Sequence, residues 1–348
     1  MILYKVDTKG KLRELSITTA HGELIQSSGL IEGVKIIHKK ECTPKNVGKS
    51  NETTAEEQSL LEKEALITRK LVEGYFKTEE EAKNSEVILP MLAKEYNKEQ
   101  HKIDWSKPVF IQPKLDGMRC LGNKFHMISR KNKEITTLTH IQKVLEKTDI
   151  LDYLDGEVYA HGLSFQENMK LIKKYRPGQT EQVSYHLYDM VLPNLSFEQR
   201  YTLLKRIKES IDSNSFEIVP TFKICNEEGL KKFHAKFIAQ GYEGSIIRHG
   251  KDGYKVNGRS SNLLKYKDFK DMDAEVIDVI SSEARPLQGV LVCKGGFKAN
   301  LKFSHIEREE ILKNKQDYIG KIANIRYFEK TDAGLPRFPV CVGFHEDR

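Results

Sequence analysis

The middle of the chain alternates strand-like with helix-like runs, and this alternation limits the possible folds more than any other feature. The strand-like runs are 109–112, 125–128, 184–188 and 244–248. The helix-like runs are 138–147, 165–174, 197–211 and 227–240. Short apolar runs favour strands and apolar residues three or four apart favour helices. Together they predict a mixed α/β domain from Val87 to about Lys267.

The first forty residues predict a small antiparallel sheet. Strand-like runs read ILYKVD, ELSITT and KIIHKK. Turn signals separate them at Lys9-Gly10, His21-Gly22, Ser27-Ser28-Gly29 and Glu32-Gly33. Glycine and small polar residues punctuate strands in this way. The chain therefore begins with short strands that pair through tight turns.

A helix and a charged linker are expected after this sheet. Thr54 and Glu57 have capping-box spacing, which predicts a helix start. An apolar stripe follows and stops near Gly74; its residues are Leu60, Leu61, Leu66, Ile67 and Leu71. The segment KTEEEAKNSE, residues 77–86, has the charge density of a linker. We place the domain boundary there, giving a first domain of residues 1–80.

The segment after residue 268 predicts a second kind of domain. Five strand-like runs read AEVIDVIS, GVLVCKG, ANLKFS, ANIRYFEK and FPVCVGF, with one helical piece near 305–315. Five short strands in about eighty residues suit a small barrel of the oligonucleotide-binding type. The predicted domains are therefore 1–80, 84–268 and 269–348, an α+β multidomain chain.

The charge balance favours a polyanionic partner. There are 57 basic and 50 acidic residues, a formal net charge of +7, and such an excess suits nucleic acid. The five cysteines have no paired spacing for zinc, and their odd number is unlike a disulfide framework. We expect a reducing compartment, no membrane partner and a monomer. The expected location is the cytoplasm of a bacterium or of a virus-infected cell, or the nucleus in a eukaryote.

The stretch KLDGMR, residues 114–119, has two interpretations. In the first, Asp116-Gly117 is a hairpin turn and both basic side chains are solvated. In the second, Lys114 is a reactive amine. An ordered series of further motifs supports the second: Ser129-Arg130, LDGEVY with Glu157, YHLYDM with Tyr188, EGSIIR with Glu243, and LLKYK with Lys265 and Lys267.

This series resembles the motifs of covalent nucleotidyltransferases, the superfamily of ATP-dependent DNA ligases, RNA ligases and capping enzymes. In length and order it is most similar to a small DNA ligase. The resemblance implies an ATP-grasp-like adenylation domain followed by an OB-fold domain, with ATP and Mg²⁺ as cofactors. It further implies nicked double-stranded DNA as the substrate.

The resemblance also implies a role for each motif residue. Lys114 would carry AMP, and Arg119 and Arg130 would contact the nucleotide sugar or DNA phosphates. Glu157 would hold the ribose hydroxyl and, with Glu243, would bind the metal ion. The remaining contacts to adenine and the α-phosphate would come from Tyr188 by stacking, Gln112 by reading the base edge, and Lys265 and Lys267 on the phosphate.

The chemistry of lysine agrees with this interpretation. An attacking amine must be unprotonated, whereas free lysine titrates near pH ~10.4. Burial and neighbouring cations disfavour its charged form. Arg119, Lys265 and Lys267, together with bound magnesium, would provide that positive field.

The chain departs from the resemblance at its far end. Many family members carry R-x-D-K there, which orients the pyrophosphate leaving group; the best match here is HEDR, with His345 and Arg348 in the basic positions. A charged tail explains the same residues. If HEDR takes the place of R-x-D-K, the contact to pyrophosphate is weakened or comes from another residue. Arg337 in LPRFPV is a candidate for that residue.

The first eighty residues resemble a WGR domain, a DNA-break-binding module of poly(ADP-ribose) polymerases. The asparagine and the TTAEEQ helix entry match, but Leu15 stands where the name-giving tryptophan is expected. Basic residues outnumber acidic ones in the first fifty, which suits phosphate contact. We expect Lys35, Lys39 and Lys40 to bind DNA, although a solvated surface explains them as well.

Three alternatives to a DNA ligase stay open at this point. An RNA ligase and a GTP-dependent capping enzyme share the same chemistry, although neither accounts for a WGR-like module. A non-catalytic DNA-break-binding adaptor is the third. The HEDR ending favours the adaptor, whereas the intact series argues against it: Lys114, Glu157, Glu243, Lys265 and Lys267.

Overall fold

The computed structural model describes residues 1–7, 10–84, 87–283 and 285–345. By its internal contacts the chain divides into two compact units, residues 1–266 and 267–348. No helix in these described ranges is long and apolar enough to cross a membrane.

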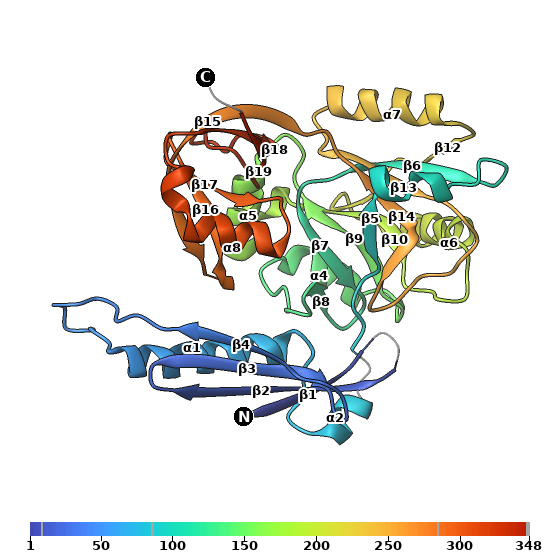
Figure 1. Cartoon of the computed structure of the whole chain (residues 1–348). Coiled ribbons are helices and arrows are strands. Elements are labelled where there is room, and N and C mark those ends of the chain that lie inside the picture. The colour runs from blue at the N-terminus through green and yellow to red at the C-terminus, as the bar shows by residue number, and fades with distance from the viewer. Residues whose placement is uncertain (8–9, 85–86, 284, 346–348) are drawn as a thin grey trace. The chain divides into compact units, whose positions relative to one another are not determined.

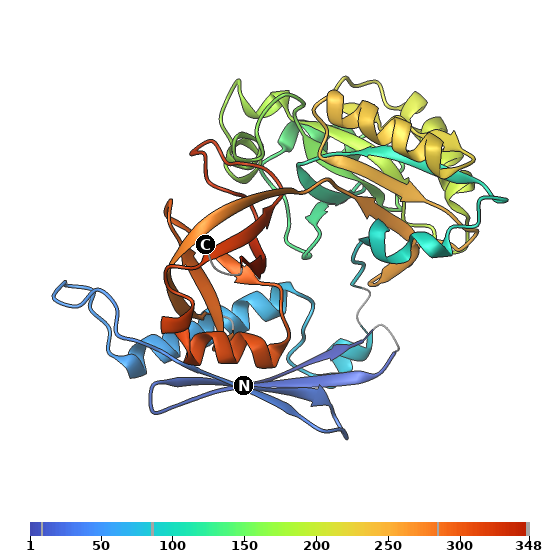
Figure 2. The ribbon, with the colours of Figure 1, turned by 45° about the horizontal axis from the view of Figure 1, so that its top comes forward.

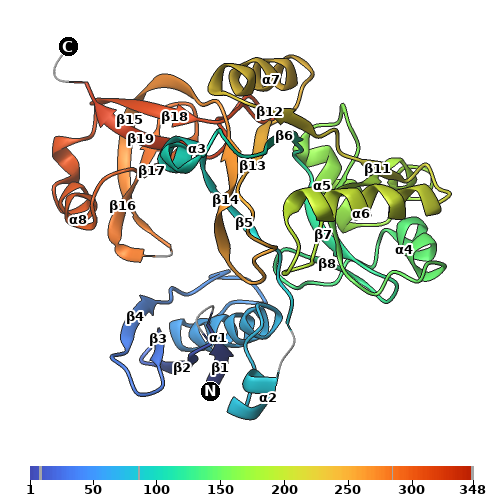
Figure 3. The same ribbon diagram turned by 90° about the vertical axis from the view of Figure 1, so that its right-hand side faces the viewer.

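The chain begins with a four-stranded antiparallel sheet whose strands follow sequence order. The strands are β1 (Ile2–Val6), β2 (Leu12–Ala20), β3 (Glu23–Leu30) and β4 (Ile36–Glu41). The long helix α1 (Ala55–Val72) lies across one face of this sheet (Figure 3) and begins at the predicted capping box of Thr54 and Glu57. Leu66 and Ile67 of α1 pack on Leu15, Ile17 and Leu24 to form a small core.

Three expectations for this region are wrong. Ser27-Ser28-Gly29 is not a turn, because these residues pair with β2 on one side and β4 on the other. The apolar stripe of α1 includes two exposed leucines, Leu60 and Leu61, because at this level the helix buries Gln58 and Ser59 instead. The linker 77–86 contains the helix α2 (Glu79–Asn84), which buries Ala82; Ser85 and Glu86 lie outside the described residues.

The middle of the first unit is built on two five-stranded sheets. One has the strand order β12-β6-β13-β14-β5, from β5 (Leu92–Glu95), β6 (Val109–Lys114), β12 (Phe222–Ile224), β13 (Gly244–Arg248) and β14 (Arg259–Tyr266). The other has the order β11-β10-β9-β7-β8, from β7 (Met118–Gly122), β8 (Met127–Ser129), β9 (Leu154–Tyr159), β10 (Ser184–Met190) and β11 (Phe216–Ile218).

Helices cover these sheets and complete their cores. On the first sheet, α7 (Glu227–Ala239) packs with Leu230 and Phe237 buried, as Figure 1 shows above β6 and β13. The core of the second sheet includes residues of α4 (Thr139–Glu146), α5 (Phe165–Lys173) and α6 (Phe197–Ser210). The short α3 (Tyr96–Glu99) follows β5.

The predicted α/β character and all four helices are confirmed. The predicted strand 125–128 begins two residues too early, because Phe125 is exposed and β8 begins at Met127. Prediction also misses β5, β7, β9, β11, β12 and β14. In β7, β9 and β14, charged residues or glycine interrupt the apolar pattern, because these strands carry candidate site residues.

Asp116 and Gly117 bend the chain, but they do not form a hairpin. They connect β6 to β7, which belong to different sheets. A Cβ atom at Gly117 would lie 2.5 Å from the carbonyl oxygen of Val158 and 2.7 Å from the Cβ of Tyr159. Glycine is therefore needed here for a close approach to β9 rather than for a turn.

The second unit is a closed barrel with the strand order β15-β16-β17-β19-β18. Its strands are β15 (Lys270–Ser282), β16 (Arg285–Cys293), β17 (Phe297–Leu301), β18 (Ile322–Tyr327) and β19 (Val340–Phe344). The helix α8 (His305–Lys313) packs beside β16, which can be followed in Figure 2. The five predicted strands and the one helical piece are confirmed.

Candidate nucleotide-binding site

Strand register brings the candidate residues of the first sheet into one row. Gln112 of β6 lies opposite Ile246 of β13, and Ile246 lies opposite Lys265 of β14. Partners across a sheet point to the same face. Lys114, two residues after Gln112, therefore shares this face with Lys265, and its own partner is Gly244. The glycine leaves space beside the lysine side chain.

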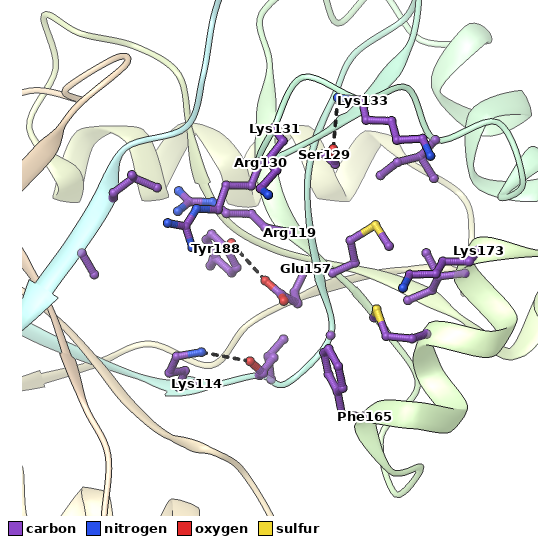
Figure 4. A pocket seen from close by; sticks show the side chains of 18 of the residues that line it. Lys114, Arg119, Ser129, Arg130, Lys131, Lys133, Glu157, Phe165, Lys173 and Tyr188 are labelled. Atoms are coloured by element: carbon purple, nitrogen blue, oxygen red, sulfur yellow. Dashed lines mark hydrogen bonds between the residues drawn. The ribbon is translucent and has the colours of Figure 1, made fainter. Parts of the chain in front are cut away.

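The second sheet contributes another set of side chains. Arg119 of β7 lies opposite Glu157 of β9. The pairing of β9 with β10 shifts register between Leu187 and Asp189, so Tyr188 occupies a β-bulge. Bulges re-aim side chains and are common beside functional sites. One pocket is lined by Gln112, Lys114, Arg119, Arg130, Glu157, Tyr188 and Lys265, most of which are labelled in Figure 4.

Lys114 is held by an acidic partner. Its ammonium contacts the carboxylate of Glu243, a buried residue at the start of the β13 segment. The two residues are 129 positions apart in sequence. A buried carboxylate needs a partner of opposite charge, and Lys114 provides it. The predicted nucleophile and the predicted metal ligand are thus neighbours.

Glu157 and Tyr188 form the opposite wall of the pocket, where Figure 4 shows them side by side. The Tyr188 hydroxyl donates to Glu157 Oε2 at 3.4 Å. Burial raises the pKa of Glu157 to about 7, against the opposing effect of Lys114 and Arg119. Such a carboxyl changes charge near neutral pH, as groups at functional sites often do.

Arg119 is committed to a buried carboxylate. Its Nε and Nη2 donate to Asp155 at 2.9 and 2.5 Å, and the Tyr254 hydroxyl donates to the same carboxylate at 2.6 Å. Despite burial, the charge of Asp155 keeps the pKa of Arg119 well above its usual value. Its positive charge is largely compensated inside the protein.

Lys265 and Arg130 are less compensated cations. Burial lowers the pKa of Lys265; Glu95 opposes this, while Lys114, Arg259 and Arg130 lower it further. Burial and the neighbouring Arg119 likewise lower the pKa of Arg130. Positive groups therefore crowd this side of the pocket, an arrangement that suits a polyanionic ligand such as a nucleotide phosphate.

Comparison with known proteins agrees with this geometry. The family model for the ATP dependent DNA ligase domain matches residues 90–267, half of the chain. The chain belongs to the ATP-dependent DNA ligases. A second family model, the DNA ligase OB-like domain, matches residues 289–344 of this ligase.

Individual relatives of the ligase include DNA ligases of viruses. The DNA ligase of African swine fever virus (isolate Warthog/Namibia/Wart80/1980) is 27% identical, covering 87% of this chain and 78% of that protein. The DNA ligase of Enterobacteria phage T4 is 22% identical, covering 74% and 68%. A solved Lig E DNA ligase has a TM-score of 0.62 at 22% identity, covering 74% of this chain and all of that one, and shares its fold.

Some predicted residues of the ligase belong to the second unit and are not among the residues that line the pocket. Lys267 is the first residue of the second unit, where its ammonium lies 4.6 Å from the centre of the Phe328 ring. His345 Nε2 lies 2.8 Å from Asp273 Oδ1 on the barrel, and Arg348 lies outside the described residues. Arg337 pairs with Glu329. The HEDR alignment therefore stays a prediction.

The three lysines predicted to bind DNA all have acidic partners. Lys35 Nζ lies 2.9 Å from Glu14, Lys39 lies 3.6 Å from Glu23, and Lys40 lies 2.7 Å from Glu62. Lys35 also donates to the carbonyl of Ile31 at 2.8 Å. Lys35 is thus held in the domain, whereas Lys39 is the most exposed of the three.

Sequence reasoning assigned no role to four charged residues in or near the pocket, of which Arg248 lines it: Asp155, Asp189, Arg200 and Arg248. All are buried in strands or helices of the middle domain. A usable signal was present, because three of them stand within or beside the motifs LDGEVY, YHLYDM and EGSIIR. A charge inside an apolar strand must be paired, and these residues pair with one another or with Arg119.

Proposed function

We propose that this ligase seals nicks between a 5′-phosphate and a 3′-hydroxyl in duplex DNA, with Lys114 as the residue that carries AMP. The observation that supports it best is the convergence of Lys114, Glu157 and Lys265, from two sheets, around one pocket. ATP and a lysine–AMP intermediate follow from family membership. Lys114 is the lysine of the pocket that has a buried carboxylate as its ion-pair partner.

The first step of the proposed reaction is self-adenylylation. The Lys114 ammonium first passes a proton to the Glu243 carboxylate that it contacts. The free amine then attacks the α-phosphorus of ATP; a P–N bond forms, and the P–O bond to pyrophosphate breaks. Glu243 holds the Lys114 side chain in place beforehand. The Lys265 ammonium stabilises the charge that develops on the α-phosphate. AMP then passes to the 5′-phosphate of the nick, and attack by the 3′-hydroxyl releases it, with each step governed by positioning.

Glu157 and Tyr188 would orient the nucleotide. The Glu157 carboxylate is placed to accept a hydrogen bond from a ribose hydroxyl, while the Tyr188 ring provides a face for adenine. The guanidinium carbons of Arg119 and Arg248 each lie 5.7 Å from the centre of that ring. These cations hold the ring in place through cation–π contact.

The pocket suits Mg²⁺ only if the protein and the nucleotide both supply ligands to the ion. Among the described residues, no group of three or more histidine, cysteine, aspartate or glutamate side chains could hold a metal. Glu243 and Glu157 would therefore supply one or two ligands, with water and phosphate oxygens completing the shell, as Mg²⁺ commonly accepts. The ion would neutralise phosphate charge.

Each predicted domain would have its own role, and the two that flank the adenylation domain would hold the DNA. Residues 1–80 would act as the WGR-like module, residues 84–268 as the adenylation domain and residues 269–348 as an OB fold, in a monomeric protein. A sheet-plus-helix arrangement and the exposed Lys39 support a role in DNA binding for the first of these. These domains would clamp the duplex through contacts to its phosphates.

A covalent labelling experiment tests this function. The full chain is incubated with magnesium and α-labelled ATP or GTP, and nicked DNA, a nicked DNA–RNA hybrid or single strands are then added. We expect label from ATP on the wild type and transfer to nicked duplex DNA, and no label on Lys114→Ala. Lys94→Ala is a matched control, because Lys94 also pairs with a glutamate, at 3.0 Å, but lies outside the pocket.

The outcomes separate the alternatives. Label from GTP alone favours a capping-type enzyme, and transfer only to the hybrid favours RNA ligation. Labelled protein with an intact Lys114→Ala signal would exclude Lys114 as the carrier. Absence of label from either nucleotide, with DNA binding retained, would support the adaptor.

A further inference from the structure

The side-chain amide of Gln112 has a fixed orientation. Its Nε2 group donates to Thr221 Oγ1 at 2.8 Å and to the Tyr188 carbonyl oxygen at 3.3 Å. Thr221 in turn donates its hydroxyl hydrogen to the Val219 carbonyl, at 3.1 Å, and so meets Gln112 as an acceptor. Both amide hydrogens are thereby used. The Gln112 side chain is 1% exposed yet lines the nucleotide pocket.

Arg248 fixes the position of the amide oxygen of Gln112. Its Nε donates to Gln112 Oε1 at 2.8 Å, across 136 positions of sequence. A guanidinium only donates, so it fixes which end of the amide is oxygen. Arg248 cannot turn away, because its Nη1 donates to the buried Asp189 at 2.5 Å. Asp189 is also held by Arg200, at 2.6 and 3.0 Å.

One hydrogen-bonding position of the amide is left after these contacts among the described residues. A carboxamide has two donor hydrogens and two acceptor lone pairs; three of the four are used. The fourth is a lone pair on Oε1. Gln112 can therefore offer the pocket an acceptor, and it cannot offer a donor without breaking a bond to Thr221 or Tyr188.

Adenine and guanine differ in the hydrogen-bonding group at position 6. Adenine carries an amino group there, which is a donor, and guanine carries an oxygen, which is an acceptor. An acceptor on the protein pairs with the first and repels the second. A site with a buried polar group of this kind rejects the mismatched analogue strongly, because the group is then left unpaired.

We propose that Arg248 is a positioning residue for base selection: by fixing the amide of Gln112 with its oxygen toward the pocket, it makes the ligase prefer adenine over guanine nucleotides. This inference rests on the proposed function and on the role in reading the base edge that the family resemblance implies for Gln112. Arg248 also lines the pocket, and the role proposed here is exerted through the amide of Gln112. The buried carboxylate of Asp189 holds Arg248 in place.

The test measures lysine labelling with three nucleotides: ATP, GTP and purine riboside triphosphate, which lacks a group at position 6. The readout is the ratio of kcat/KM for ATP to that for GTP. Arg248→Met keeps the length of the side chain and removes the donor to Gln112. We expect this ratio to fall at least about tenfold. The kcat/KM for ATP should approach that for purine riboside triphosphate.

Arg200→Met is the matched control. It removes an equally buried guanidinium from the same carboxylate, yet Arg200 makes no contact with Gln112. It should destabilise the ligase as Arg248→Met does and leave the ATP to GTP ratio unchanged. A parallel fall in both variants would mean that general loosening, rather than the amide, sets selectivity, and would overturn the proposal.

A second variant acts from the other side of the amide. Thr221→Val removes the acceptor for Nε2 without disturbing a buried charge, so it remains informative if Arg248→Met fails to fold. We expect the ATP to GTP ratio to fall here too, by a smaller factor. An unchanged ratio in Thr221→Val, or in a folded Arg248→Met, would overturn the inference while labelling of the wild type by ATP leaves the proposed function intact.

Discussion

Two regions within the first unit of this ligase, residues 1–266, both pair their charges, but at different depths. One is built on the two five-stranded sheets (the middle domain), and the other is the N-terminal sheet with α1 (the N-terminal domain). In the middle domain, Asp189 and Arg200 expose almost no side-chain surface, at 0% and 2%. In the N-terminal domain, Lys39 is 60% exposed and its partner Glu23 is 31% exposed. Water competes for the second pair and is excluded from the first.

This difference separates two uses of charge. Buried pairs fix the geometry of the nucleotide pocket, because removing one partner leaves an uncompensated charge in a medium of low polarity. Exposed pairs exchange partners easily and are screened by salt. The N-terminal lysines can therefore be released from their carboxylates to bind phosphate, whereas Asp155 and Asp189 cannot be released without loss of structure.

The largest expected effect comes from breaking a buried pair. Asp189→Asn leaves Arg200 and Arg248 without their shared carboxylate, and we expect a loss of about 3–5 kcal/mol in the free energy of unfolding. Urea titration followed by fluorescence of Trp105, the single tryptophan, reports this domain. Glu23→Gln, followed by circular dichroism, should cost less than about 1 kcal/mol. Equal losses would contradict the distinction.

An intermediate effect is expected from pH. Because burial raises the pKa of Glu157 to about 7, its carboxylate form decreases below that pH and labelling of Lys114 by ATP should fall about tenfold per pH unit. Stability changes the opposite way: a carboxyl whose pKa is raised on folding stabilises the protein only while protonated, so the free energy of unfolding falls as pH rises from about 4.5 to 7.

Glu157→Gln checks both parts of this expectation. The variant should label more slowly at pH 8 and lose the ascending limb of the labelling profile near pH 7. Its free energy of unfolding should also vary less with pH between about 4.5 and 7. A profile with the same slope in wild type and variant would assign the limb to another group.

The smallest effect concerns the exposed lysines. Lys39→Gln combined with Lys40→Gln should reduce the slope of log affinity against log salt by about 1 for each DNA phosphate that the variant no longer neutralises. Labelling by ATP should not change. Lys63→Gln, on α1, serves as the control. A salt slope that stays the same in the double variant would remove these lysines from the DNA interface.

Much of the fold was readable from local pattern. The four helices of the middle domain and the strands of the barrel follow from apolar periodicity, and Thr54 with Glu57 marked the start of α1. The strands β7 and β9 were missed, because Arg119 and Asp155-Gly156-Glu157 break that periodicity, whereas β6 and β10, which also carry site residues, were predicted. Local reasoning fails where a strand must hold charge instead of apolar surface.

The sequence by itself determined the chemical inventory of this ligase: a lysine before Asp-Gly, the acidic and aromatic motifs in their order, and the excess of basic residues. Only the tertiary structure decided their partners. Lys114 meets Glu243, and Arg248 meets Gln112, across 129 and 136 residues. Such pairings depend on strand register and on the crossing between sheets at Gly117, which local pattern does not specify.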